Sequence, residues 1–98
     1  MPSTPKPKMF ENTFKGVRVL VTGHTGCKGT WLSHWLHQLG AEVHGIALPP
    51  EGASGAFHTQ SGIDKLISNR FFDIRDKGSL AQAVTEIEPQ IVFHLAAQ

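Results

Sequence analysis

The apolar residues of the chain fall into four short runs and two longer amphipathic stretches. Residues 17–22 (VRVLVT) and 41–48 (AEVHGIAL) are apolar, rich in β-branched side chains and bounded by glycine or proline. Residues 69–74 (NRFFDI) and 90–96 (QIVFHLA) have the same character. Short runs of this kind are typical of buried β-strands, so we predict four strands.

The two amphipathic stretches have the spacing of α-helices. The first spans residues 28–39, with apolar positions at Trp31, Leu32, Trp35, Leu36 and Leu39. It is followed by Gly40, which suits a helix end because glycine adopts positive φ readily. The second spans residues 77–88, with apolar positions at Leu80, Ala83, Val84 and Ile87. Asp76 can cap this helix and Pro89 ends it.

Between the second and third strands we expect a loop over residues 49–62, with no more than a short helical turn at 56–60 and another at 64–67. Strands that alternate with helices indicate a parallel sheet. Right-handed crossovers then give the strand order 3-2-1-4. The predicted fold class is therefore α/β, the N-terminal half of a Rossmann-type doubly wound parallel sheet.

Composition narrows the class of protein. The chain has 98 residues, 40% apolar and 17% charged, with a net charge of +1. This is typical of one globular domain and gives no general attraction to nucleic acid or to a membrane surface. No apolar run has the length of a membrane span, and the first residues lack the apolar core of a secretory signal. We therefore expect a cytoplasmic protein with a flexible leader over residues 1–13.

Three glycines follow the first predicted strand at the start of the first predicted helix. Gly23, Gly26 and Gly29 form the pattern G-x-x-G-x-x-G. At such a turn the main chain can approach a pyrophosphate closely, and the helix N-terminus favours the anion. Thr22, Thr25 and Lys28 could add contacts to phosphate. A tight turn with close helix packing is the alternative, whereas the spacing does not match a P-loop.

The histidines are weaker candidates. His34 and His37 lie three residues apart on one helix, but no further ligand is spaced to complete a metal site, so we expect none. His44 and His94 lie within strands, where hydrogen-bonded structural roles are expected. His24 lies inside the glycine loop, and either a contact with phosphate or ribose or a role in filling the turn is open.

The remaining candidates concern the cofactor. Cys27 is the single cysteine, which excludes an internal disulfide, and we expect it to have a packing role. The second predicted strand lacks at its end the acidic residue that binds the ribose of NAD. Glu42 lies at the other end of this strand and Glu51 lies beyond the turn, so NAD and NADP both remain open.

The segments VTGHTGCKGTWLSHWL, AEVHGIALPP, DIRD and IVFHLAAQ resemble the N-terminal part of the CDP-glucose 4,6-dehydratases, which are extended short-chain dehydrogenase/reductases. The resemblance covers residues 14–98 and implies that they form a partial NAD(P)-binding Rossmann domain. One departure is Cys27, where the family usually has phenylalanine. The implied cofactor-binding residues are Gly23, His24, Thr25, Gly26, Cys27, Lys28 and Gly29 around the pyrophosphate, Asp73 and Ile74 at the adenine, and Leu95, Ala96 and Ala97 beside the adenosine.

The resemblance also implies a reaction. The family oxidises a CDP-linked glucose at C4 with bound NAD, eliminates water across C5 and C6, and returns the hydride to C6. This chemistry needs a Tyr-x-x-x-Lys pair, and the chain contains no tyrosine. We therefore expect no catalytic residue in these 98 residues, a nucleotide-sugar substrate for the complete protein, and a fourth strand whose exposed edge favours self-association, with a homo-oligomer possible. The alternatives are a non-catalytic NAD(P)-binding regulatory module, or another extended dehydrogenase such as a sugar-nucleotide epimerase or a GDP-mannose dehydratase.

Overall fold

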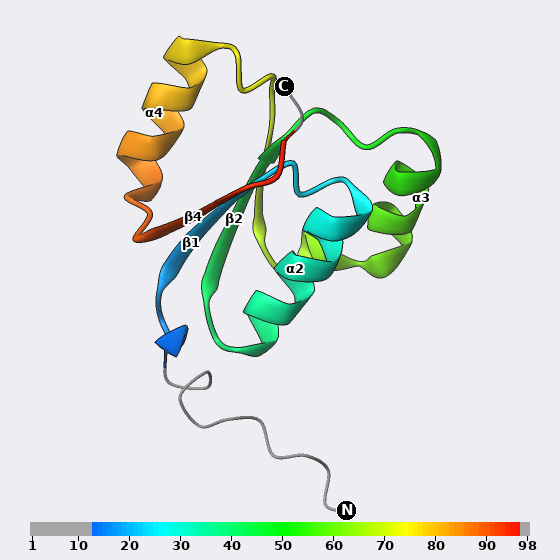
Figure 1. Ribbon diagram of the computed structural model, residues 1–98, viewed down its shortest axis with the longest axis horizontal. Coiled ribbons are helices and arrows are strands. Elements are labelled where there is room, and N and C mark those ends of the chain that lie inside the picture. Colours follow the sequence, from blue (N-terminus) through cyan, green and yellow to red (C-terminus); the bar gives the residue numbers. More distant parts are fainter. Residues whose placement is uncertain (1–12, 97–98) are drawn as a thin grey trace, which may run out of the picture.

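A computed structural model describes residues 13–96, in which strands and helices alternate along the chain (Figure 1). In chain order the elements are β1 (Arg18–Thr22), α2 (Cys27–Gln38), β2 (Glu42–Ala47), α3 (Gly52–Ser61), the short 3-10 helix η1 (Ile63–Lys65), β3 (Ser68–Phe71), α4 (Lys77–Ile87) and β4 (Ile91–His94). The predicted leader lies outside the described residues except for Thr13.

The four strands form one parallel sheet in the order β3-β2-β1-β4. This confirms the predicted order. Right-handed crossovers add β2 and then β3 on one side of β1, and the crossover through α4 places β4 on the other side of β1. β1 therefore lies in the interior of the sheet, between β2 and β4. The loop that follows β1 consequently lies beside the ends of both neighbours.

Helices cover both faces of the sheet: α2 and α3 lie on one face and α4 on the other (Figure 1). Successive side chains of β1 point to opposite faces. Val19 and Val21 pack with Leu36 of α2, whereas Leu20 packs with Ala83 and Ile87 of α4. Helices cover both faces of the sheet, and a small core lies on each face. This explains why the strands are continuous apolar runs in the sequence.

Two elements differ from the sequence-based prediction. The expected turn at 56–60 is a ten-residue helix, α3. Glycine weakens helix propensity, but at Gly55 an added Cβ would lie 2.7 Å from the carbonyl carbon of Pro50, so a close approach requires glycine there. The third strand ends at Phe71 rather than Ile74, because Asp73 starts a turn in which its main-chain carbonyl accepts from Asp76 N.

Within residues 13–96, no helix is long and apolar enough to cross a lipid bilayer. The longest helix, α2, has 12 residues. A span needs about 20 apolar residues.

The cap of α4 gives a first test of the fold. The Asp76 carboxylate accepts hydrogen bonds from Ser79 N at 3.2 Å and from Ser79 Oγ at 2.8 Å. Replacing Asp76 by Ala should lower the free energy of unfolding by about 1 kcal/mol, because an N-terminal N–H of the helix loses its partner. Urea denaturation followed by circular dichroism measures the change. Asp76→Asn keeps the accepting oxygen and should retain most of the stability; equal losses in both variants would contradict the capping role.

Candidate functional site

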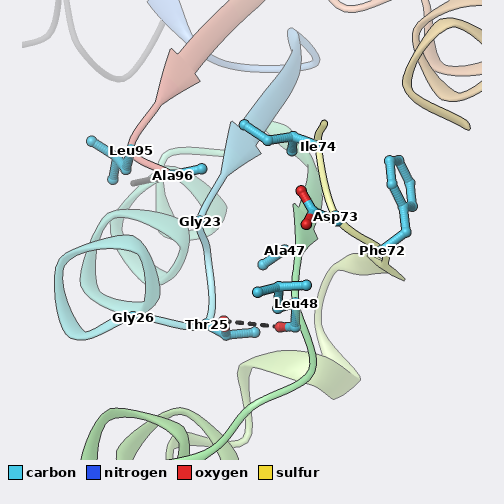
Figure 2. Close-up of a pocket in the computed structure, with 10 residues that line it drawn as sticks. All are labelled: Gly23, Thr25, Gly26, Ala47, Leu48, Phe72, Asp73, Ile74, Leu95 and Ala96. Carbon is cyan, nitrogen blue, oxygen red and sulfur yellow. Dashed lines mark hydrogen bonds between the residues drawn. The ribbon is translucent and has the colours of Figure 1, made fainter. Parts of the chain in front are cut away.

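A cavity of about 330 Å³ opens at the carboxyl ends of the strands, where Figure 2 shows its lining residues. The loop after β1, the end of β2, the segment after β3 and the segment after β4 all contribute to it. In an open parallel sheet, this edge is where ligands bind, at the point where the strand order reverses. The lining residues are Gly23, Thr25, Gly26, Ala47, Leu48, Phe72, Asp73, Ile74, Leu95 and Ala96.

The three glycines of the loop meet different surroundings. Gly23 has φ of +79°, and an added Cβ would lie 2.7 Å from Ala96 N. At Gly29 an added Cβ would lie 2.3 Å from the carbonyl oxygen of Gly23, so the helix packs directly on the loop. At Gly26 the nearest atom would be 3.6 Å away, and its φ of −77° is ordinary. The protein therefore requires glycine at the first and third positions, while a side chain at the second would make only an ordinary van der Waals contact and would line the cavity.

The N-terminus of α2 lies between this cavity and a second hollow. The second hollow is lined by Gly23, Gly26, Cys27, Lys28, Gly29, His94 and Leu95. Gly26 is the N-cap of α2 and provides no side chain, and the first turn contains no acidic residue. The first N–H groups of the helix therefore have no side-chain cap, and with the helix dipole they favour an anion.

The two threonines of this region bind within the protein. Thr25 Oγ1 donates to the carbonyl of Leu48 at 3.2 Å, which joins the glycine loop to the end of β2 (Figure 2). Thr22 is buried, and its hydroxyl bonds His94 Nδ1 at 2.7 Å. The first contact lies in the wall of the cavity, and the second joins the ends of β1 and β4.

The imidazole of His24 lies beneath the glycine loop and lines neither hollow. It is fully buried, stacks on Phe71 with ring centroids 5.7 Å apart, and lies against Gly45, where an added Cβ would be 2.3 Å from its ring. Asn69 donates its amide hydrogens to the carbonyls of Asp64 and Ile67, so its oxygen accepts from His24 Nε2 at 2.7 Å.

Burial is the main reason why the pKa of His24 is lowered, and the neutral ring is thereby favoured. Of the two roles that the sequence left open, the side chain therefore fills the turn. The other role, a contact of the ring with phosphate or ribose, finds no support in this geometry, because the ring is fully buried and lines neither hollow.

The other strand histidines have the structural roles expected of them. His44 Nε2 bonds Glu42 Oε2 at 2.7 Å, and His94 bonds Thr22. Cys27 differs from expectation: its thiol is exposed, lines the second hollow and lies 3.5 Å from Ser54 Oγ, so it has no core-packing role. The expected packing role was wrong, because Cys27 lies on the exposed side of the first turn of α2, whereas Gly29 and Thr30 on the other side of that turn are buried.

At the other end of the cavity, Asp73 is held by Arg75. The Arg75 Nη2 donates to Asp73 Oδ2 at 2.6 Å, and Arg75 N donates to Asp73 Oδ1 at 2.9 Å. Hydrogen bonds from the guanidinium, and then from the main chain, lower the pKa of the Asp73 carboxyl to about 2. Asp73 is therefore a carboxylate at neutral pH, with an orientation fixed by its neighbour.

Most of the predicted site residues meet at these two hollows. The cavity includes Gly23, Thr25, Gly26, Asp73, Ile74, Leu95 and Ala96, and the second hollow adds Cys27, Lys28 and Gly29. Ala97 lies outside the described residues. Ala47, Leu48 and Phe72 also line the cavity but were not predicted from the sequence. The first two lie at the end of β2, where NAD-binding domains usually have a carboxylate for the ribose.

The family follows from a comparison with known proteins. The model of the NAD dependent epimerase/dehydratase family matches residues 19–98. The chain belongs to this family. The CDP-glucose 4,6-dehydratase of Salmonella typhimurium is 44% identical over 88 residues, which cover 90% of this chain and 24% of that protein. The GDP-mannose 4,6-dehydratase of Yersinia enterocolitica is 34% identical over 91 residues, 83% of this chain and 23% of that protein.

Solved structures of the family have the same fold. An epimerase from Methanothermobacter thermautotrophicus superimposes with a TM-score of 0.76 at 32% identity, covering 100% of this chain and 27% of that one. A UDP-glucose-4-epimerase from Stenotrophomonas maltophila, with bound NAD and formylated UDP-arabinopyranose, superimposes with a TM-score of 0.67 at 29% identity. The match covers 84% of this chain and 25% of that one. The chain thus spans about a quarter of the length of these relatives, all of which are dehydratases or epimerases by name.

The contact between His24 and Gly45 gives a second test. Gly45→Ala should lower the free energy of unfolding by about 1–3 kcal/mol, because the new methyl group would overlap the fully buried ring. The matched control is Gly78→Ala on the exposed face of α4, where the nearest atom would be 3.7 Å away. This change should stabilise the helix by about 0.5–1 kcal/mol. Thermal unfolding of both variants measures the difference, and a fully stable Gly45→Ala variant would contradict the packing described.

The Asp73–Arg75 pair gives a third test. Because the folded-state pKa of Asp73 is about 2 and the ordinary value is 3.8, its stabilising contribution is complete above pH 3.8 and is lost as pH falls through about 2. In Arg75→Gln, NMR titration should show the carboxyl titrating closer to 3.8. An unchanged pKa in that variant would show that the guanidinium is not its cause.

Proposed function

We propose that this chain is the dinucleotide-binding part of a nucleotide-sugar 4,6-dehydratase and that it binds NAD along the carboxyl edge of its sheet. The observation that carries the proposal is the contrast among the three loop glycines. Gly23 and Gly29 are required by close contacts within the protein, whereas an added Cβ at Gly26, at an uncapped helix N-terminus, would make only an ordinary van der Waals contact. A bare main chain at that place suits a diphosphate, since a side chain there would obstruct the approach.

The two hollows give the dinucleotide its direction. In the proposed arrangement the adenosine lies in the cavity near Asp73 and Ile74, with Leu95 and Ala96 on its other side. The pyrophosphate crosses Gly26, and the rest of the molecule continues into the second hollow beside Lys28. The exposed ammonium of Lys28 adds the positive charge that the neutral, buried His24 does not provide. The residues present fit the cofactor in shape and in charge.

When bound, NAD supplies the hydride acceptor for oxidation at a sugar carbon and the donor for its return. The residues of this chain bind the cofactor and orient it. Asp73, kept anionic by Arg75, offers an acceptor at the adenosine end, and the N–H groups of α2 face the phosphates. The 44% identity to a CDP-glucose 4,6-dehydratase supports CDP-glucose as the substrate of the complete protein. A cytoplasmic location and a homo-oligomeric complete protein remain predictions.

Binding is tested at Gly26. Replacing it by Ala should leave stability close to that of the unaltered chain, because no protein atom lies nearer than 3.6 Å to the new Cβ. It should weaken NAD or ADP-ribose binding by about tenfold or more, equivalent to about 1.4 kcal/mol. Isothermal titration calorimetry measures both ligands, with Gly78→Ala as the control of unchanged affinity. Equal affinity in the Gly26 and Gly78 variants would refute the proposed path of the pyrophosphate.

The same titrations with NADP compare the two cofactors. The end of β2 carries Ala47 and Leu48 and offers no arginine for a 2′-phosphate, so we expect NAD to bind more tightly. Tighter binding of NADP would overturn this preference.

The reaction is tested on the complete protein. Incubation with CDP-glucose and NAD should give a CDP-linked 4-keto-6-deoxy sugar, detected by mass spectrometry as the loss of one water. GDP-mannose and UDP-glucose serve as competing substrates. Turnover of GDP-mannose alone, or epimerisation without loss of water, would assign the chain to another branch of the family, and cofactor binding without turnover of any of these would favour the regulatory module.

A further inference from the structure

A buried polar cluster lies beneath the glycine loop, on the side away from the cavity. His24 comes from the loop, His58 from α3 and Asp64 from η1, and one ligand atom of each lies within 4.8 Å of the other two. Both imidazoles are fully buried, and their ring centroids are 5.3 Å apart. Three side chains that can each bind a metal ion are thus brought together from three segments of the chain.

We propose that His24, His58 and Asp64 form a binding site for one divalent transition-metal ion of the zinc type. Two imidazole nitrogens and one carboxylate oxygen are a donor set that zinc accepts, whereas magnesium and calcium prefer oxygen alone. The proposal does not depend on cofactor binding, because none of the three side chains lines either hollow.

The distances between these groups suit a shared ion after a small adjustment. His58 Nε2 is 2.5 Å from Asp64 Oδ1. Ligand atoms on a tetrahedral zinc are about 3.3 Å apart, given bonds of about 2.0–2.2 Å. The His58–Asp64 pair would therefore open and His24 would move inward. Asn69 Oδ1 accepts from His24 Nε2 at 2.7 Å and orients the ring, which leaves Nδ1 as the nitrogen with a lone pair for the ion.

Two further features favour an ion. The other ring nitrogen of His58, Nδ1, lies 2.9 Å from the Thr30 hydroxyl, an orientation by an outer group that metal-binding histidines usually have. His24 Nδ1 is buried and no side chain of the described residues bonds it, so the ring has unused bonding capacity. Asp64 is 39% exposed at its side chain and gives an ion a route from solvent.

The rival interpretation is a metal-free hydrogen-bond network made by the same atoms. In that network a proton joins His58 to Asp64, and the cluster only attaches α3 and η1 to the loop. Metal binding would replace this proton, and the two cases differ in whether added metal changes the protein.

The test uses the whole chain without nucleotide, first treated with a chelator. Stoichiometric Zn²⁺ should raise the melting temperature, and Co²⁺ should give visible absorption bands of a tetrahedral site that saturate at one ion per chain. Asp64→Asn keeps a hydrogen-bond acceptor of the same shape but removes the anionic ligand, and it should raise the dissociation constant by at least about tenfold. His58→Gln should do the same.

The matched control is the double variant His34→Gln/His37→Gln, which removes two histidines that lie three residues apart on α2 and are not part of the cluster. It should bind the ion as the unaltered chain does. Circular dichroism of metal-free Asp64→Asn checks that this variant is folded. Because the Asp64 side chain is partly exposed, we expect the variant to fold, so it tests metal binding even if His58→Gln does not fold. Absence of binding, or binding that survives Asp64→Asn but not the control substitutions, would overturn the proposal.

Discussion

The packing of this fold depends on the main chain of the glycine loop being in direct contact with its neighbours on three sides. The end of β4 passes so close to Gly23 that any side chain there would overlap Ala96. Gly29, in the first turn of α2, packs against the carbonyl of Gly23. Gly45 of β2 packs against the ring of His24. These contacts connect β1, β2, β4 and α2 at the edge where the cavity opens. The shape of the cavity is therefore a consequence of main-chain packing more than of the side chains that line it.

The order of strands and helices could be predicted from the sequence because each element has a clear local pattern. β1 and β2 are continuous apolar runs since both of their faces are covered, and α4 has a capping aspartate and a terminating proline. The extent of α3 could not be predicted in this way. Its glycine content argues against a helix, and only the contact of Gly55 with Pro50 explains why the glycine is there.

The site was partly predictable for the same reason. The glycine spacing identifies the loop that borders the cavity, and Asp73 with Ile74 follows from the resemblance to a family. The position of the His24 side chain was not predictable, because its partners Gly45, Asn69 and Phe71 belong to strands far away in the sequence. The cluster with His58 and Asp64 has no regular spacing at all, since it forms only when α3 and η1 pack under the loop.

The exposed position of Cys27 has a consequence for how this loop can diverge between related proteins. Its thiol contacts Ser54 at the surface and supports neither core cluster. The conformation of the loop is instead maintained by Gly23, by Gly29 and by the buried ring of His24. A change of side chain at residue 27 therefore leaves the packing beneath the loop unaltered. Residue 27 can thus differ in size and polarity without any compensating change in the two core clusters.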